Sequence, residues 1–181
     1  MNKNIVIRPA TIADAELIAH AVCMAVGYDI SHPIYPVFLI LARMDCSQYS
    51  YRNSLIAEVD GEGVGALVGY DGALLEELRK PIFPLIEKHL VTTSTIEDET
   101  KAGEFYLDSC GILPEFRGMG IGRALITTMR DNAFAAGHER VGLIVDVDNH
   151  DAERLYLSLG FKYVGNKRFL GHDMHHLQAR K

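Results

Sequence analysis

The segment Arg117-Gly-Met-Gly-Ile-Gly122 has the composition of an anion-binding loop. Its glycines allow the backbone to approach a ligand without obstruction by side chains. The segment leads into a helical pattern, and the N–H groups of a helix's first turn, together with the helix dipole, attract negative charge. Arginines at positions 117 and 123 add positive charge. We therefore interpret this loop as a phosphate-binding site.

The glycine spacing argues against two common nucleotide sites. The dinucleotide fingerprint is Gly-x-Gly-x-x-Gly, whereas this loop reads Gly-x-Gly-x-Gly and lies past the middle of the chain. The P-loop ends in Gly-Lys-Ser/Thr, which is missing here. A glycine-rich turn that only packs a helix on a sheet is the alternative that the spacing leaves open.

Strands and helices alternate around this loop, which predicts one α/β domain over residues 4–179. Runs rich in β-branched and apolar residues predict strands over 4–8, 54–59, 64–70, 104–113, 140–147, 161–164 and 169–178. Helical spacing predicts one helix between a Thr11 cap and Gly27, and others over 37–44, 120–136 and 150–159. Two prolines should split 72–90 into two short helices. Residues 91–103 have no period and are expected to form an exposed loop.

Composition and charge narrow the class of protein. The 181 residues are 48% hydrophobic, enough for a core without disulfides or a structural metal. A formal net charge of −6 argues against a nucleic-acid partner. No apolar run reaches the ~20 residues that cross a bilayer, and the N-terminus lacks signal-peptide features. We therefore expect no membrane partner and a cytoplasmic location.

We expect no metal site. The cysteines at positions 23, 46 and 110 are too widely spaced for a zinc site or a disulfide framework, and buried free thiols are the favoured interpretation. The run 146–151 resembles the start of an EF-hand loop but lacks its glycine and its final glutamate. His172, His175 and His176 have no other ligands in view, so we interpret them as surface or pocket residues.

Two motifs resemble the GNAT superfamily of N-acetyltransferases. Cys110-Gly-Ile-Leu-Pro-Glu-Phe-Arg-Gly-Met-Gly-Ile-Gly-Arg-Ala-Leu125 resembles its core motif, a strand and a proline followed by Arg/Gln-x-x-Gly-x-Gly/Ala at a helix start. Asn149-His-Asp-Ala-Glu-Arg-Leu-Tyr-Leu-Ser-Leu-Gly-Phe161 is similar to its Asn-x-x-Ala-x-x-Leu-Tyr-x-x-x-Gly-Phe segment. The run from Ile7 to Ala15 is typical of its openings. Residues 28–53 and 72–103 match nothing general in the family, so substrate choice should reside there.

The resemblance implies a fold and a cosubstrate. The fold is a mixed sheet of six to seven strands flanked by helices, with two central parallel strands, here 104–113 and 140–147, splayed apart. Acetyl-CoA would lie in that opening, with the Ile112 N–H or a close neighbour facing the thioester carbonyl. The residues implied to bind the cosubstrate are Cys110, Gly111, Ile112, Leu113, Arg117, Gly118, Met119, Gly120, Ile121, Gly122, Arg123 and Asn149.

The resemblance also implies an acid and a base for acetyl transfer to an amine. Tyr156 stands at the family's acid position, where a phenol would protonate the leaving thiolate. Asp108 stands where some members carry a carboxylate base, four residues before Ile112. By the strand period of two, we expect it on the same face as Glu104, Tyr106, Cys110 and Ile112. A structural aspartate is the alternative. Other members use a glutamate on the next strand, where this chain has Ile144, although Asp146 is nearby.

The acceptor amine is not identified by the sequence. Aromatic and acidic side chains that could line a site for a small cationic amine are Tyr28, Asp29, Tyr49, Tyr51, Glu104, Tyr106 and the acidic run 97–99. A peptide N-terminus or an amino acid is also compatible. A catalytically silent acyl-CoA-binding module and a protein binding another nucleotide or phosphate are the rival hypotheses. Homodimers are common in the family, and nothing in the sequence determines the oligomeric state.

Overall fold

The computed structural model describes residues 4–90 and 96–181 and contains one mixed seven-stranded sheet. The strand order is β1-β2-β3-β4-β5-β7-β6, and β4 with β5 is its parallel pair. The strands are β1 (Ile5–Pro9), β2 (Ser54–Val59), β3 (Glu62–Asp71), β4 (Phe105–Ile112), β5 (Arg140–Asp146), β6 (Lys162–Phe169) and β7 (His172–Arg180). The predicted α/β fold with a mixed sheet is confirmed.

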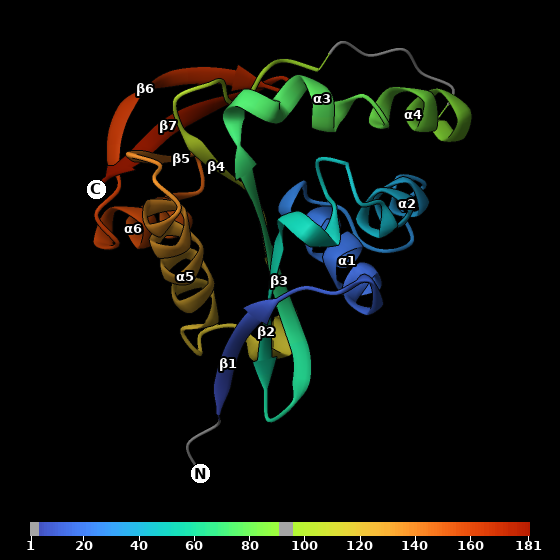
Figure 1. Ribbon diagram of the computed structural model, residues 1–181, viewed down its shortest axis with the longest axis horizontal. Coiled ribbons are helices and arrows are strands. Elements are labelled where there is room, and N and C mark those ends of the chain that lie inside the picture. The colour runs from blue at the N-terminus through green and yellow to red at the C-terminus, as the bar shows by residue number, and fades with distance from the viewer. Residues whose placement is uncertain (1–3, 91–95) are drawn as a thin grey trace.

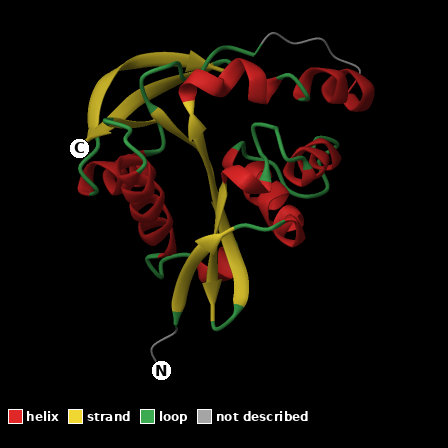
Figure 2. Ribbon diagram, in the orientation of Figure 1, coloured by secondary structure: helices red, strands yellow, loops and turns green. Residues whose placement is uncertain are grey.

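Helices cover both faces of this sheet (Figures 1 and 2). They are α1 (Ala15–Ala25), α2 (Tyr35–Arg43), α3 (Leu75–Arg79), α4 (Ile82–Leu90), α5 (Ile121–Ala135) and α6 (His150–Ser158). One hydrophobic core lies between α1, α2 and the sheet, and α3 and the start of α4 add to it. A second core lies between α5 and the opposite face, with α6 at its edge. None of the helices in the described ranges is long and apolar enough to cross a membrane.

The predicted boundaries are close to those observed in most elements. Prolines do split 72–90, into α3 and α4, with Pro84 in the first turn of α4, where a helix tolerates it. The largest difference is at the C-terminus, where β6 extends to Phe169 and a Leu170–Gly171 turn leads into β7. Both turn residues have positive φ, 48° and 83°. The hairpin was missed because the turn carries only one glycine.

The loop predicted over 91–103 is only partly exposed. Residues 91–95 lie outside the described residues. Farther along, the side chains of Glu99 and Thr100 are each 2% exposed, so the expectation of an exposed loop is wrong there. Both are hydrogen-bonded inside the molecule, which offsets the cost of removing them from water.

The parallel strands β4 and β5 separate soon after they meet. They pair at two positions, Phe105 with Val141 and Tyr106 with Gly142, and no further pairing between these strands follows. Beyond this point β4 stays closely packed against α1. A Cβ at Gly111 would lie 2.5 Å from the Cα of Ala21, so glycine lets α1 pack directly on the strand. The predicted splayed strands are therefore present, and the opening lies beside the second half of β4.

A β-bulge in β4 reverses the faces of the strand. Leu67 pairs with Cys110 and Gly69 with Leu107, so two residues of β4 stand opposite one of β3. As a result, Tyr106 packs in the core beneath α1, whereas Cys110 and Ile112 pack in the core beneath α5. The expectation that Asp108 shares a face with Cys110 and Ile112 is wrong, because the period of two is interrupted at the bulge.

Candidate active site

The glycine loop forms an open N-terminus for α5. Gly118 and Gly120 have φ angles of 76° and 82°, a left-handed conformation that favours glycine. An added Cβ at either position would meet no described atom within 4 Å. Gly120 is the N-cap, and within the described residues no side chain caps the helix there. The N–H groups of the first turn therefore have no side-chain cap from the described part of the chain, which leaves them available to an anion.

The two arginines of the loop have partners within the chain. Arg117 Nε donates to the Ile112 carbonyl, 3.1 Å away, and thereby ties the loop to the end of β4. Arg123 Nη2 donates to Ser158 Oγ at 2.8 Å and connects α5 to α6. Their charges lie near the loop, and in this structure their hydrogen bonds hold the loop against β4 and α5 against α6.

Backbone groups of β4 face the opening between β4 and β5. The Leu113 N–H donates to the Val64 carbonyl on β3, 2.9 Å away. Because successive N–H groups of a strand point to opposite edges, the N–H of Ile112 and that of Cys110 point toward the opening. Gly111, which pairs with Ala66, lies between them with its backbone toward β3. The opening is therefore lined by polar backbone groups that could pair with an extended ligand.

Tyr156 of α6 lies on the same side of the sheet as Cys110. Its ring packs edge-on against Phe161, with 6.1 Å between centroids, and belongs to the edge of the core beneath α5. Burial and then the nearby Cys110 thiol raise the pKa of the Tyr156 phenol, so the hydroxyl stays protonated at neutral pH. No described residue forms a hydrogen bond with that hydroxyl. The Tyr156 hydroxyl is thus a protonated donor, and no hydrogen bond to a described residue occupies it.

Asn149 is the N-cap of α6. Its side-chain oxygen accepts a hydrogen bond from the Ala152 N–H at 3.2 Å, which satisfies one of the free donors of the first turn. The side chain therefore has a structural role, and it lies in an exposed position.

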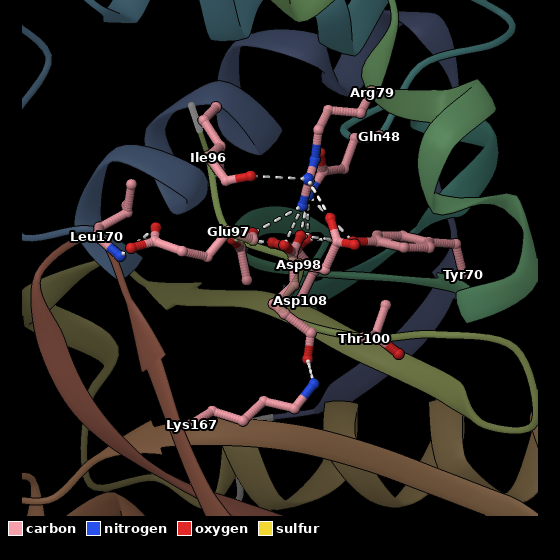
Figure 3. A network of polar contacts seen from close by, with 12 residues as sticks. Gln48, Tyr70, Arg79, Ile96, Glu97, Asp98, Thr100, Asp108, Lys167 and Leu170 are labelled. Atoms are coloured by element: carbon pink, nitrogen blue, oxygen red, sulfur yellow. Dashed lines mark hydrogen bonds and ion pairs between the residues drawn. The ribbon is translucent and has the colours of Figure 1, made fainter. Parts of the chain in front are cut away.

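Asp108 lies on the opposite side of the sheet within a polar network (Figure 3). Its Oδ2 accepts hydrogen bonds from Gln48 Nε2 at 2.7 Å and from the Tyr70 hydroxyl at 2.8 Å. Its Oδ1 accepts one from Ser109 Oγ at 2.7 Å. Burial raises the pKa of Asp108, and these three hydrogen bonds oppose the rise because they favour the charged form. Asp108 is a partly exposed carboxyl group with more affinity for a proton than an ordinary aspartate.

Glu99 is the second carboxyl group of this network. Its Oε1 accepts from Gln48 Nε2 at 2.6 Å and lies 3.0 Å from the Tyr70 hydroxyl, and its Oε2 is paired with Arg79 Nη2. Burial and then the negative charge of Asp108 raise the pKa of Glu99 to about 7, against the opposing effect of Arg79. Burial and the neighbouring carboxylate therefore both favour the protonated form of Glu99.

The structure gathers some of the predicted acceptor residues and separates others. Tyr49 and Tyr106 lie close enough to Asp108 for its charge to raise the pKa of both phenols, after burial as the main cause. Glu104 is 3% exposed and bonded to Thr100, His176 and Gln178, so its contacts are internal.

Three predicted residues make their contacts outside this network. Tyr28 stacks on His32 with 3.8 Å between ring centroids and is 46% exposed. Asp29 accepts from Ser31 in a local turn. The Tyr51 hydroxyl donates to Asp45 at 2.5 Å. Nothing in these contacts connects the three residues to Asp108.

Sequence reasoning missed most partners of Asp108. Gln48 falls in a polar stretch between a predicted helix and a predicted strand, Tyr70 ends the predicted strand over 64–70, and Arg79 belongs to the short helix α3. Glu99 was seen only as part of an acidic run. The sequence offered one signal for this network, which is Arg79 in a short helix followed by three successive carboxylates at 97–99. A buried guanidinium needs a negatively charged partner, and this run could supply one.

The three cysteines differ in exposure, and the three C-terminal histidines each contact a carboxylate. Cys23 is buried as expected, Cys110 is partly buried, and Cys46 is exposed, so buried thiols are a wrong expectation for Cys46. The histidines at 172, 175 and 176 contact Asp146, Glu153 and Glu104 respectively, each carboxylate on a different element. Within the described ranges no cluster of three or more metal-ligating side chains is found.

Comparison with known proteins agrees with this geometry. The chain shares a TM-score of 0.80 and 33% identity with a solved acetyltransferase, over 97% of this chain and 98% of the other. An N-acetyltransferase structure from Staphylococcus aureus Mu50 has a TM-score of 0.75 at 21% identity, over 96% and 100% of the two chains, which supports the fold alone. Mycothiol acetyltransferase from Nocardiopsis dassonvillei is 44% identical over 66 residues, which span 36% of this chain and 19% of that protein.

The comparison with protein families covers most of the chain. The profile of the Acetyltransferase (GNAT) family matches residues 26–161, from the end of α1 to the residue before β6. This range contains the glycine loop, the splayed strands and Tyr156. The chain belongs to the Acetyltransferase (GNAT) family.

Proposed function

We propose that this protein transfers the acetyl group of acetyl-CoA to a primary amine by direct attack within a ternary complex. The observation that carries the proposal is the arrangement around the opening between β4 and β5. A protonated phenol, Tyr156, lies on one side of the sheet, and a carboxyl group with raised proton affinity, Asp108, lies on the other. The two proton transfers of amide formation need one group of each kind.

The residues present fit acetyl-CoA. The open α5 N-terminus at Gly118 and Gly120 suits a pyrophosphate, and the backbone of Cys110 and Ile112 suits the extended pantetheine arm. When bound, the cosubstrate supplies a thioester whose acyl carbon is electrophilic. The Ile112 N–H, which points into the opening, is the candidate donor for negative charge developing on the acyl oxygen.

Asp108 is the candidate base for the acceptor. An alkylamine has a pKa of roughly 10, so it reaches the site mainly as an ammonium ion that cannot attack. Asp108 would take the proton and leave the nitrogen lone pair free. Its hydrogen bonds to Gln48 and Tyr70 fix the carboxyl group, and its partial exposure leaves it within reach of an acceptor.

Tyr156 is the candidate acid for the leaving thiolate. Its raised pKa keeps the proton on the phenol until a strongly basic group is nearby. The side chain lies beside Cys110, whose backbone faces the opening, so the phenol is on the side where the cosubstrate would enter.

A panel of amines with acetyl-CoA, followed by release of free thiol, tests the proposal. We expect turnover with at least one cationic primary amine. Binding of acetyl-CoA in calorimetry without turnover across diamines, amino acids and peptides with free N-termini would instead indicate a silent acyl-CoA-binding module. Tight binding of ATP without a response to acetyl-CoA would exclude both.

A further inference from the structure

Two carboxyl groups on the acceptor side share the same hydrogen-bond donors. Glu99 Oε1 and Asp108 Oδ2 lie 2.6 and 2.7 Å from Gln48 Nε2, and 3.0 and 2.8 Å from the Tyr70 hydroxyl. Oxygens that contact the same two atoms fall within the roughly 4–6 Å over which like charges disfavour each other. The Tyr70 hydroxyl has one hydrogen, so it cannot donate to both oxygens at once.

The charges around this pair favour one retained proton. Arg79 is 7% exposed and pairs with Glu99, which is 2% exposed. Asp98, which also binds Arg79, is 70% exposed and is solvated by water. Two ionised carboxylates would therefore face one close buried guanidinium, and a single proton between Glu99 and Asp108 restores the balance.

The remaining titratable groups around the pair do not supply a second positive charge that could take the place of the proton. The phenols of Tyr49, Tyr70 and Tyr106 all have pKa values raised by burial and stay neutral. Lys167 of β6 donates a hydrogen bond from Nζ to the Glu99 backbone carbonyl at 2.6 Å (Figure 3). It is also attracted by the charge of Glu104, whose carboxylate is bonded to His176. Its charge is therefore shared with a second carboxylate.

We propose that Glu99 and Asp108 form an exchange pair that holds one proton in the absence of acceptor and binds a cationic primary amine by releasing that proton. The inference rests on the proposed function, and it names the acceptor class as an ammonium ion. Glu99, which is buried, acts through Asp108 and is a positioning residue. Asp108, which is partly exposed, is the group that meets the acceptor.

The proton count of this cycle closes. The ammonium ion enters as the resting proton leaves to solvent, so the cluster of two carboxylates, Arg79 and the ammonium ion is neutral. An N–H bond of the ammonium then breaks and an O–H bond forms at Asp108, which gives a neutral amine with a free lone pair. The nitrogen lone pair then forms a bond to the acyl carbon, the C–S bond breaks, and the leaving thiolate takes the Tyr156 proton. The nitrogen loses its second proton to solvent, from which the Tyr156 phenol recovers its own. When the amide product leaves, the pair again holds one proton, and each turnover has released one proton to solvent.

Carbon-detected NMR of the side-chain carboxyl groups in the full chain tests the pair without any substrate. We expect one carboxyl of the pair to remain protonated near neutral pH. Glu99→Gln should move the titration of Asp108 to lower pH by about one unit or more, and Asp108→Asn should do the same to Glu99. Titration of both groups in the ordinary carboxyl range in the wild-type protein would overturn the pair, whatever the activity.

Two further variants separate the pair from a structural effect. Asp98→Asn removes a carboxylate from the same Arg79 without touching Asp108, and we expect it to leave the Asp108 titration unchanged. Glu99→Asp keeps the charge and should restore the raised titration that Glu99→Gln loses. An equal shift in Asp98→Asn and Glu99→Gln would show that Arg79, and not the pair, controls Asp108.

The activity profile then tests the exchange with the best amine of the panel. The acid limb of kcat/KM should follow the titration of the pair and move to lower pH in Glu99→Gln. A raised carboxyl titration in an enzyme that acetylates no amine would leave the pair intact and reject the proposed function. An acid limb that does not move in Glu99→Gln, while the Asp108 titration does, would reject the exchange.

Discussion

The two sides of the opening between β4 and β5 are built in different ways. On the α5 side, all the groups that would hold the cosubstrate except Asn149 come from one stretch of chain, 110–123, and they are mostly backbone N–H groups and glycines. On the α1 side, the Asp108 network is made of side chains from five places in the chain: the loop after α2, β3, α3, the loop before β4, and β4 itself.

The difference indicates which part of the site is general and which is specific. Backbone groups recognise the parts of a cosubstrate that do not vary, and they depend on local conformation more than on side-chain identity. A network of side chains can change with a few substitutions while the sheet remains the same. The acceptor side is therefore where this chain is expected to differ most from its relatives.

The largest effect is expected on the acceptor side, from Asp108→Asn. Loss of a general base lowers the rate by about 10²- to 10⁴-fold, and the amide keeps the size of the side chain. We expect kcat/KM for the amine to fall by that amount, measured by thiol release, with unchanged acetyl-CoA affinity in calorimetry. Asp146→Asn is the matched control, since Asp146 contacts His172 away from the network. A larger loss in that control would move the base to Asp146.

On the cosubstrate side, Tyr156→Phe removes one hydroxyl and should lower kcat by more than about tenfold. No described residue bonds that hydroxyl, so stability should change by less than about 0.5 kcal/mol and acetyl-CoA affinity should stay the same. Stopped-flow thiol release and thermal unfolding measure the two quantities. Tyr163→Phe, which loses a surface hydrogen bond to Asn166, is the control. Unchanged turnover in Tyr156→Phe would remove the residue from the mechanism.

The two sides of the site also differ in how much of each could be predicted from the sequence. The glycine loop is a local pattern, because a strand, a proline and a helix start follow each other within a few residues. The splayed strands and Tyr156 were expected only from the resemblance to a known family. Asp108 was identified as a candidate base, but the strand face predicted for it was wrong. One bulge in β4 reverses the faces of the strand, and a bulge leaves no regular sequence signal. Glu99 and Gln48 meet Asp108 across 9 and 60 residues of chain, a contact that only the folded sheet and its loops create.

A smaller effect on the cosubstrate side is expected from Gly120→Ala. The positive φ makes the substitution cost about 1–2 kcal/mol in stability, and the new methyl group occupies open space at the N-terminus of α5. Gly137→Ala is a matched control at the other end of the same helix, with φ of 102° and equally open surroundings. Both variants should unfold at lower temperature. Weakening of acetyl-CoA binding, by about tenfold in calorimetry, is expected in Gly120→Ala alone, and equal affinities would argue against a phosphate at this terminus.

The smallest effect separates two roles of Asn149, the cap of α6 and a proposed contact with the cosubstrate. Asn149→Ala removes the bond to the Ala152 N–H and should cost about 1 kcal/mol of stability, whereas Asn149→Ser keeps a capping oxygen and should cost much less. Both variants lack the amide, so both should weaken acetyl-CoA binding by a few-fold if the amide contacts the cosubstrate. An affinity change in Asn149→Ala alone would mean that Asn149 acts through the helix, because only the loss of the cap can then account for it.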